Sequence, residues 1–564
     1  MDALVEPLFC DLDVEVAIKS RARSRGHLLL KLRVGDDLRE GFGVSDAVAL
    51  RDDYAHVVGY VGAVSDKDLE RIEAPEALLR LPRFQIGKIG LEARREDLLR
   101  GTAGSRRVEV NAAGRIMREL DRQEGQPGAD IQITLDNELQ GYTHARLKGE
   151  SAAAVVLDCE SGDVLVSASS PSYDPNLFVR GISVANYRAL LENPYRPLPN
   201  KAVQGIYPPG STFKMVTALA ALEDGQIDIN ETVYCPGHKE ISGRRFHCWK
   251  RGGHGTVNMA KGIYQSCDVY YYHFAQRIGM DPIAAMAQRC GMGQEFPLPV
   301  ASQFYGTVPY PAWKEEKYGR PWQAFDTVNA TIGQGYMLAN PLQLAVMSAR
   351  LATGRHVQPR LVTSTPVKGF DEVDFAPEHV AYVRQAMSDV VNGPGTAGRA
   401  RLPFDDIKMA GKTGTAQVVG LNLSDGKSGP WKYRDHGLFI FFAPFDKPKY
   451  AGAVVIEHGG GSGSAYPIAR DVMTFLFDPE KGMEMLRGFE EQWGGTAQQR
   501  LDAKYRAYAA AAGEDVKPVP ARDEEIFDQV EAEARLAVRR QESLADEKVD
   551  PRLDTSLSSG QASE

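Results

Sequence analysis

The stretch GIYPPGSTFKMVTALAALE, residues 205–223, contains a segment that interrupts regular secondary structure, followed by the start of a predicted helix. Two prolines and a glycine are followed by Ser211, which opens an apolar run with Lys214 one turn later. Residues three positions apart lie on one face of a helix, and the first turn has backbone N–H groups without partners inside the helix. Ser211 would therefore lie beside an amine base and free amide donors, which is the arrangement of an activated nucleophile.

Taken alone, Ser-x-x-Lys is weak evidence, because Ser is a common helix cap and short motifs match by chance. A second copy, Ser424 with Lys427, lies in a Gly-containing segment without helical periodicity. Two further motifs change the interpretation: YQSCDVYYYHFA contains Ser266 and Asp268, and MAGKTGTAQ contains Lys412, Thr413, Gly414 and Thr415. A decoy Ser-x-Asp at Ser172 and Asp174 precedes the nucleophile and is followed by a proline.

The pattern of the whole chain predicts an α+β fold. Residues 151–176 read as two strands around a Ser-Gly turn, a helical middle follows, and three short apolar strands begin near residue 410. The segment at 469–477 then reads as a closing helix. We expect the early and late strands to share one antiparallel sheet.

Domain boundaries follow changes in composition. Residues 1–145 are charged and mixed, with a β element expected at 54–64 and a helix capped by Asp136. Residues 146–485 carry the three motifs, and residues 486–564 read as a charged helical and disordered tail. A chain of 564 residues is long enough for such a division.

Charge and hydropathy give no support to nucleic-acid binding, to a membrane span or to a signal peptide. The net charge of −9, without a basic run that interleaves aromatics, gives no support to nucleic-acid binding. No stretch is apolar for long enough to span a bilayer, and the first residues lack the pattern of a signal peptide.

The motif set Ser-x-x-Lys, Ser-x-Asn and Lys-Thr-Gly is shared by penicillin-binding proteins and class A β-lactamases. This chain has the motifs in that order, 55 and 146 residues apart, with Asp268 in place of the Asn. With RRVEVNAAGRI, TLDNELQ, PSYDPNLF and GQGYMLANPLQLA added, the chain resembles the class B penicillin-binding proteins over roughly residues 55–480, and especially their rod-elongation branch. The resemblance implies a β-lactamase-like transpeptidase domain on an elongated, mainly β pedestal, whose usual membrane anchor we expect to be missing from this chain.

The resemblance also implies the roles of the site residues. Ser211 would attack the carbonyl between two D-alanines of a peptidoglycan stem peptide, Lys214 would take its proton, and Ser266 would relay a proton to the leaving D-alanine. Asp268 can accept a hydrogen bond from Lys214 but cannot donate an amide N–H to substrate. Lys412 would supply a second cation, Thr413 and Thr415 would hold the terminal carboxylate, and Gly414 would let a peptide approach the strand. The N–H groups of Ser211 and Thr415 would form the oxyanion hole.

A second candidate site is formed by Cys235, Cys248, His254 and Cys267, which are separated by 13, 6 and 13 residues. Three thiolates and an imidazole suit a structural Zn²⁺, and the intervening segment is Gly-rich and polar, without core periodicity. The resemblance implies such a metal in some elongation-type members. Three alternatives remain open: singly buried cysteines, a disulfide between Cys235 and Cys248, or His238 or His247 as the ligand. We interpret His436, at the start of a strand, as a structural histidine.

These observations predict a monofunctional peptidoglycan D,D-transpeptidase that β-lactams acylate and that needs no cofactor for catalysis. The resemblance implies stem peptides as substrates, a RodA-type membrane glycan polymerase and other elongation-complex proteins as partners, and a catalytic domain in the periplasm, anchored to the inner membrane. A D,D-carboxypeptidase or a serine β-lactamase is the first alternative. For the β-lactamase, the nearest match to the deacylating E-x-x-L-N loop, at Glu295, lacks the Asn. The second alternative is a non-catalytic β-lactam sensor, which would need membrane segments to pass its signal.

Overall fold

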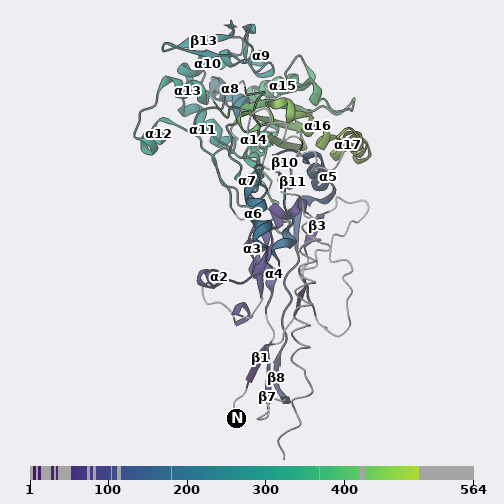
Figure 1. Ribbon diagram of the computed structural model, residues 1–564. Coiled ribbons are helices and arrows are strands. Elements are labelled where there is room, and N and C mark those ends of the chain that lie inside the picture. The colour runs from purple at the N-terminus through teal and green to yellow at the C-terminus, as the bar shows by residue number, and fades with distance from the viewer. Residues whose placement is uncertain are drawn as a thin grey trace, which may run out of the picture.

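The computed structural model describes residues 52–493, apart from short gaps at 73–76, 81–83, 103–104, 111–115, 180, 301, 368 and 420–425, together with 4–7, 11–13, 27–30, 33–35 and 503. The molecule is a wide head on a narrow stalk (Figure 1). The decoy Ser424 and most of the expected tail lie outside the described residues. Within the described residues, no helix combines the length and apolar character needed to cross a bilayer.

The stalk is built from small antiparallel sheets, as the expected mainly β pedestal requires. One sheet has the order β1 (Leu4–Pro7), β7 (Ser105–Val110), β8 (Ile116–Gln123). Three two-stranded ribbons pair β2 (Asp11–Asp13) with β4 (Arg33–Gly35), β3 (His27–Leu30) with β9 (Ile131–Asp136), and β5 (Val61–Ala63) with β6 (Gln85–Gly87). Four short helices accompany them: α1 (Ala55–Val58), α2 (Asp66–Arg71), α3 (Gly90–Arg94) and α4 (Glu96–Arg100).

The expected β element at 54–64 is wrong in its first half. Residues 55–58 form α1, and only Val61–Ala63 pair as a strand. His56 is buried in α1, where its Nε2 lies 2.6 Å from the carbonyl oxygen of Pro197. This contact joins α1 to a segment 141 residues away, and so short a hydrophobic pattern cannot reveal such a neighbour.

The head is organised by one five-stranded antiparallel sheet of order β11-β10-β18-β17-β16. Its strands are β10 (Ala152–Asp158), β11 (Val164–Ser170), β16 (Ala410–Ala416), β17 (His436–Ala443) and β18 (Tyr450–Ile456). The predicted hairpin is β10–β11, and β10 pairs with β18 from Ala152 opposite Ile456 to Asp158 opposite Tyr450. Early and late strands therefore share one sheet, as predicted, and β16 forms its edge.

Helices cover this sheet, because every residue of β10, β11 and β18 is buried and both faces must be shielded from water. Helix α14 (Pro341–Thr353) packs on β10, β17 and β18, whereas α5 (Asn137–Leu147) and α16 (Tyr466–Phe477) pack on each other and on the sheet. The predicted cap of α5 is confirmed, since Asp136 accepts from the N–H groups of Glu138 and Leu139.

The rest of the head is mainly helical. Its helices are α6 (Val184–Glu192), α7 (Lys201–Gln204), α8 (Lys214–Glu223), α9 (Met259–Tyr264), α10 (Asp268–Ile278), α11 (Asp281–Arg289), α12 (Pro311–Tyr318), α13 (Ala324–Ala330), α15 (Pro377–Asn392) and α17 (Pro479–Trp493). Two small ribbons pair β12 (Val233–Cys235) with β15 (Gly255–Val257) and β13 (His238–Ile241) with β14 (Arg244–His247). The expected boundary at 485 falls inside α17, which packs on α16 and buries Leu486.

Candidate active site

The Ser-x-x-Lys motif forms a 3₁₀ turn, Gly210–Phe213, that runs directly into α8. Gly210 has φ +54°, and a Cβ at this position would lie 2.4 Å from the carbonyl oxygen of Thr415. Only glycine therefore lets the turn approach β16 so closely. The N–H of Gly210 donates to the carbonyl of Gly333 at 2.9 Å. These contacts fix Ser211 between a buried helix and the edge strand of the sheet.

Lys214 is fully buried, and its ammonium group finds three partners. Nζ donates to Asp268 Oδ1 at 2.7 Å, to the Ser266 carbonyl at 2.9 Å and to Ser266 Oγ at 3.2 Å. The other carboxylate oxygen of Asp268 accepts from the backbone N–H of Trp249 at 2.9 Å. A buried charge needs such pairing, so Asp268 fixes the position of the Lys214 amine, three residues after Ser211 in the chain.

Lys412 approaches the same hydroxyl from β16. Its Nζ donates to Ser266 Oγ at 2.9 Å, to the Thr413 carbonyl at 2.9 Å and to Thr413 Oγ1 at 3.3 Å. Burial, and then the positive charge of Lys214, hold the pKa of Lys412 well below its ordinary value, while Asp268 acts in the opposite direction. Ser266 Oγ thus bridges two lysine nitrogens, and the hydroxyl can pass a proton between them.

Ser266 reaches this bridging position through an unusual backbone conformation. It has φ +54°, although it is not a glycine, and such conformations in other proteins are concentrated at functional sites. Its N–H donates to the carbonyl of Ile263, and the N–H of Cys267 donates to that of Gly262. The turn between α9 and α10 therefore holds the hydroxyl in place.

Gly414 fits closely against the nucleophile turn. A Cβ at this position would lie 2.7 Å from the methyl carbon of Thr212 and 3.0 Å from the Pro209 carbonyl oxygen. From the sequence, the missing side chain of Gly414 is expected to let a substrate peptide approach the strand. The structure adds that the turn containing Ser211 also needs this space. Thr413, on the same strand, shares a 2.7 Å hydrogen bond with Thr396, hydroxyl to hydroxyl.

We expect Gly414→Ala to slow acylation of Ser211 by a β-lactam at least about tenfold, because a methyl group would displace the Thr212 turn. Overpacking of this kind costs ~1–3 kcal/mol of folding free energy. Stopped-flow acylation with a fluorescent penicillin and thermal melting measure the two effects. Gly398→Ala is the matched control, since nothing lies within 4 Å of a Cβ there. Equal acylation rates in the two variants would contradict this interpretation.

Sequence reasoning missed three groups of the site. Gln334 Nε2 donates to the Thr415 carbonyl at 2.9 Å, and its only signal was its place in the quoted GQGYMLANPLQLA. The N–H of Trp249 and the hydroxyl of Thr396 gave no signal, because a backbone donor and a loop hydroxyl gain a role only through packing. Ser172, the decoy, instead donates to the Asp52 carbonyl in the stalk. The structural interpretation of His436 agrees with its Nδ1 accepting from the His458 N–H at 2.9 Å.

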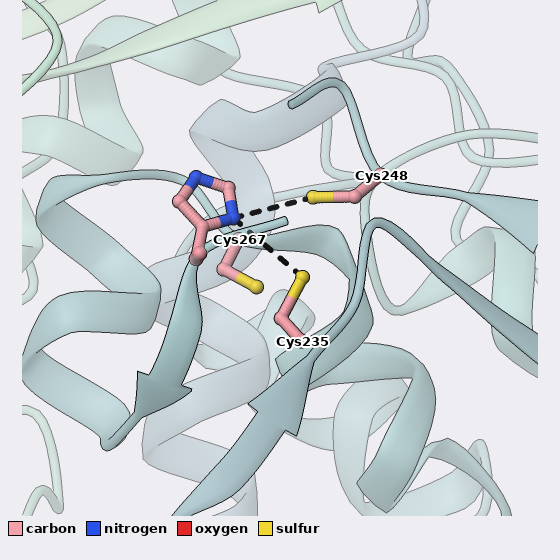
Figure 2. A group of neighbouring side chains, drawn as sticks. Cys235, Cys248 and Cys267 are labelled. Carbon is pink, nitrogen blue, oxygen red and sulfur yellow. Dashed lines mark hydrogen bonds between the residues drawn. The ribbon is translucent and has the colours of Figure 1, made fainter. Parts of the chain in front are cut away.

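The four predicted metal ligands lie together in the segment that precedes α10. Figure 2 shows the side chains of Cys235, Cys248 and Cys267 gathered around one imidazole ring. His254 Nδ1 lies 3.7 Å from Cys235 Sγ and 3.5 Å from Cys248 Sγ, and all four ligand atoms lie within 4.8 Å of one another. Ligands at ~2.3 Å from a tetrahedral zinc are roughly 3.5–4 Å apart, so the residues fit such an ion.

Two of the alternatives to this ligand set, another histidine and a disulfide, are not supported by the structure. His238 and His247 face each other across β13 and β14, with ring centroids 6.2 Å apart, and neither belongs to the group of four. Cys235 and Cys248 are both free thiols, so the disulfide is not formed. A hydrogen bond between Cys248 and Cys267 lowers the pKa of Cys248 and raises that of Cys267. A metal bound by all four residues would need the three thiols deprotonated.

Two family models match the chain: "Penicillin binding protein transpeptidase domain" over residues 152–474 and "Penicillin-binding Protein dimerisation domain" over residues 49–133. Among curated relatives, peptidoglycan D,D-transpeptidase MrdA of Acinetobacter baumannii is 39% identical, over 75% of this chain and 65% of that protein. MrdA of Escherichia coli K12 is 37% identical, over 75% of this chain and 69% of that protein. The matched part of the chain thus spans about two thirds of these relatives' length.

The chain is also similar to solved structures of penicillin-binding proteins. Penicillin-binding protein PBP2 of Helicobacter pylori, in complex with MreC, is 31% identical with a TM-score of 0.69, over 76% of this chain and 78% of that one. PBP2 of Pseudomonas aeruginosa, in complex with WCK 5153, is 34% identical with a TM-score of 0.66, over 77% and 90%. A peptidoglycan synthase complex that coordinates polymerization and crosslinking matches at 31% and 0.63, over 74% of each chain. With a site in which Ser266 bridges two lysines beside the edge strand, and a β pedestal below it, the chain belongs to the class B penicillin-binding proteins, and the relatives named here are of the PBP2 (MrdA) type.

Proposed function

We propose that this protein is a peptidoglycan D,D-transpeptidase that works through an acyl-enzyme on Ser211. The observation that carries the proposal is the bridge formed by Lys214, Ser266 and Lys412 between the nucleophile turn and the edge strand. The family membership and the activity named for the MrdA relatives support it.

In the acylation step, Ser211 Oγ attacks the carbonyl between the two terminal D-alanines and gives its proton to Lys214 in its neutral form. Burial and the positive charge of Lys214 favour the loss of a proton from Lys412. The Ser266 hydroxyl, within hydrogen-bond distance of both amines, links them for proton transfer. The N–H groups of Ser211 and Thr415 stabilise the oxyanion, a contribution worth ~10²–10³ in rate per donor in other enzymes. The C–N bond then breaks, and Ser266 relays the proton to the nitrogen of the departing D-alanine.

In the transfer step, an amine of a neighbouring stem peptide attacks the ester on Ser211. Its proton returns through Lys214 to Ser211 Oγ as the ester bond breaks, so the enzyme is regenerated and one amide replaces another. The cation of Lys412 and the hydroxyls of Thr413 and Thr415 hold the carboxylate of the donor peptide. No cofactor takes part in this scheme.

The metal would have a structural role. Cys235, Cys248, His254 and Cys267 would hold one Zn²⁺, which would bind the segment before α10 to the rest of the head. That segment supplies the Trp249 N–H to Asp268, so the ion would support the catalytic carboxylate without touching substrate.

The proposed setting is the periplasmic face of the inner membrane, with a RodA-type glycan polymerase and elongation-complex proteins as partners. Support comes from the relatives: the Helicobacter PBP2 structure is a complex with MreC, and another match is a peptidoglycan synthase complex. Co-purification of the natural full-length protein with such a polymerase tests the partnership.

Intact-mass spectrometry after incubation with a fluorescent penicillin tests the activity class. A transpeptidase should give one adduct per chain that persists for many minutes, because it deacylates slowly with water. Rapid drug turnover without an adduct would support a serine β-lactamase instead. Release of D-alanine from a donor peptide only when an amine acceptor is present separates the transpeptidase from a D,D-carboxypeptidase.

A further inference from the structure

Aromatic side chains gather on α12, on α13, on the segment between these helices and on the turn that follows α13. Both helices lie at one side of the head (Figure 1). Five rings make up this aromatic platform: Trp313, Tyr318, Trp322, Phe325 and Tyr336. Ring centroids of Trp313, Tyr318 and Tyr336 lie 5.4 to 5.7 Å apart. Tyr318 is 47% exposed and Phe325 is 40% exposed, so the platform presents ring surface to solvent.

A buried ion pair supports the platform from beneath. Lys314 is 4% exposed and its Nζ lies 2.5 Å from Asp326 Oδ2. The same ammonium lies 5.6 Å from the ring centre of Tyr336, 5.9 Å from that of Phe325 and 6.0 Å from that of Trp322. Burying a charge pair is costly and helps folding little, but this ammonium also faces three aromatic rings, an attractive arrangement.

The platform is continuous with the active site. Residues 331–336 connect α13 to Tyr336, and within this turn Gly333 accepts from the Gly210 N–H while Gln334 donates to the Thr415 carbonyl. The turn that contacts both the nucleophile segment and β16 therefore ends in a platform ring.

The composition of the surface favours one kind of ligand. Its exposed apolar side chains are aromatic, while the aliphatic anchors typical of helix docking are missing from the described residues 304–336. Exposed charges on the same helix are Glu315, Glu316 and Lys317. The Lys317 ammonium lies 5.2 Å from the ring centre of Trp313 and 5.7 Å from that of Tyr318. Flat rings edged by polar groups suit pyranose sugars, which present C–H bonds on their faces and hydroxyl and amide groups around their edges.

We propose that the aromatic platform binds the glycan strand that carries the stem peptide, with N-acetylated amino sugars stacked on Tyr318 and Phe325. This inference rests on the proposed function, because peptidoglycan supplies the glycan. The platform positions a polymeric substrate and takes no part in acylation. Small β-lactams, which have no glycan, should not depend on it.

The test is titration of the purified protein with the β-1,4-linked tetramer of N-acetylglucosamine, followed by tryptophan fluorescence and calorimetry. Tyr318→Ala and Phe325→Ala should each weaken binding about tenfold, equivalent to ~1.4 kcal/mol. Tyr187→Ala, which removes a ring that is 43% exposed on α6, should leave it unchanged. Crosslinking of glycan-linked substrate should fall in parallel in the first two variants.

Penicillin acylation of the same samples separates this inference from the proposed function. Two binding results would overturn the glycan site: equal tetramer binding by all four proteins, or no binding by the wild type. If penicillin acylation is normal in either case, the transpeptidase proposal still stands. A wild type that penicillin does not acylate would instead refute the proposed function. Normal acylation in Tyr318→Ala and Phe325→Ala also shows that the variants are folded.

Discussion

Ser211→Ala should abolish the penicillin adduct, with acylation falling by at least ~10⁴-fold, because the variant has no oxygen that can form the ester. Loss of a serine nucleophile costs ~10⁶ in rate in a comparable serine enzyme. Intact-mass spectrometry after exposure to a fluorescent penicillin measures the result directly. Ser211 is part-exposed and its side chain is not needed to cap α8, so the variant should melt within about 1–2 °C of the wild type.

The chain provides its own control for this experiment. Ser424 belongs to the second Ser-x-x-Lys, with Lys427, so Ser424→Ala should keep the full adduct. An adduct that survives Ser211→Ala, or one that disappears in Ser424→Ala, would refute the assignment of the nucleophile. Peptide mapping of the wild-type adduct to residues 205–223 provides independent support.

The sheet could be predicted from the sequence, because its strands are short apolar runs bounded by turns. This apolar pattern matches the structure, in which every residue of β10, β11 and β18 is buried. The sequence could also predict the three motifs because their spacing along the chain is distinctive. It could not predict how they meet. The bridge at Ser266 depends on a positive φ and on two lysines 198 residues apart in sequence whose burial comes from packing.

Other features of the site escaped prediction for the same reason. The Trp249 N–H that holds Asp268 is a backbone group, and any residue type could supply it. The aromatic platform is spread over three segments, whose rings look like ordinary core residues until their exposure is known. The predicted tail boundary at 485 follows the charged sequence of α17, and that sequence does not reveal that Leu486 is buried.

Removal of the metal should have the largest effect on stability. We expect the wild-type protein, purified without chelator, to contain one zinc per chain by inductively coupled plasma mass spectrometry, and Cys235→Ala to contain none. Structural zinc contributes apparent binding free energies of ~10–16 kcal/mol in zinc-finger peptides. Even a third of that would lower the melting temperature by about 10 °C, at ~2–4 °C per kcal/mol.

The same variant should also lose activity, although Cys235 lies on β12 and contributes nothing to the serine site directly. Without the ion, the segment that carries Trp249 would no longer be bound to β12 and α10, and Asp268 would lose the N–H that holds its second oxygen. Acylation should fall at least about tenfold. Cys290→Ala is the matched control, because Cys290 is equally buried but lies outside the group of four. Equal zinc content, melting temperature and acylation in the two variants would rule out the metal and leave the three cysteines as ordinary core residues.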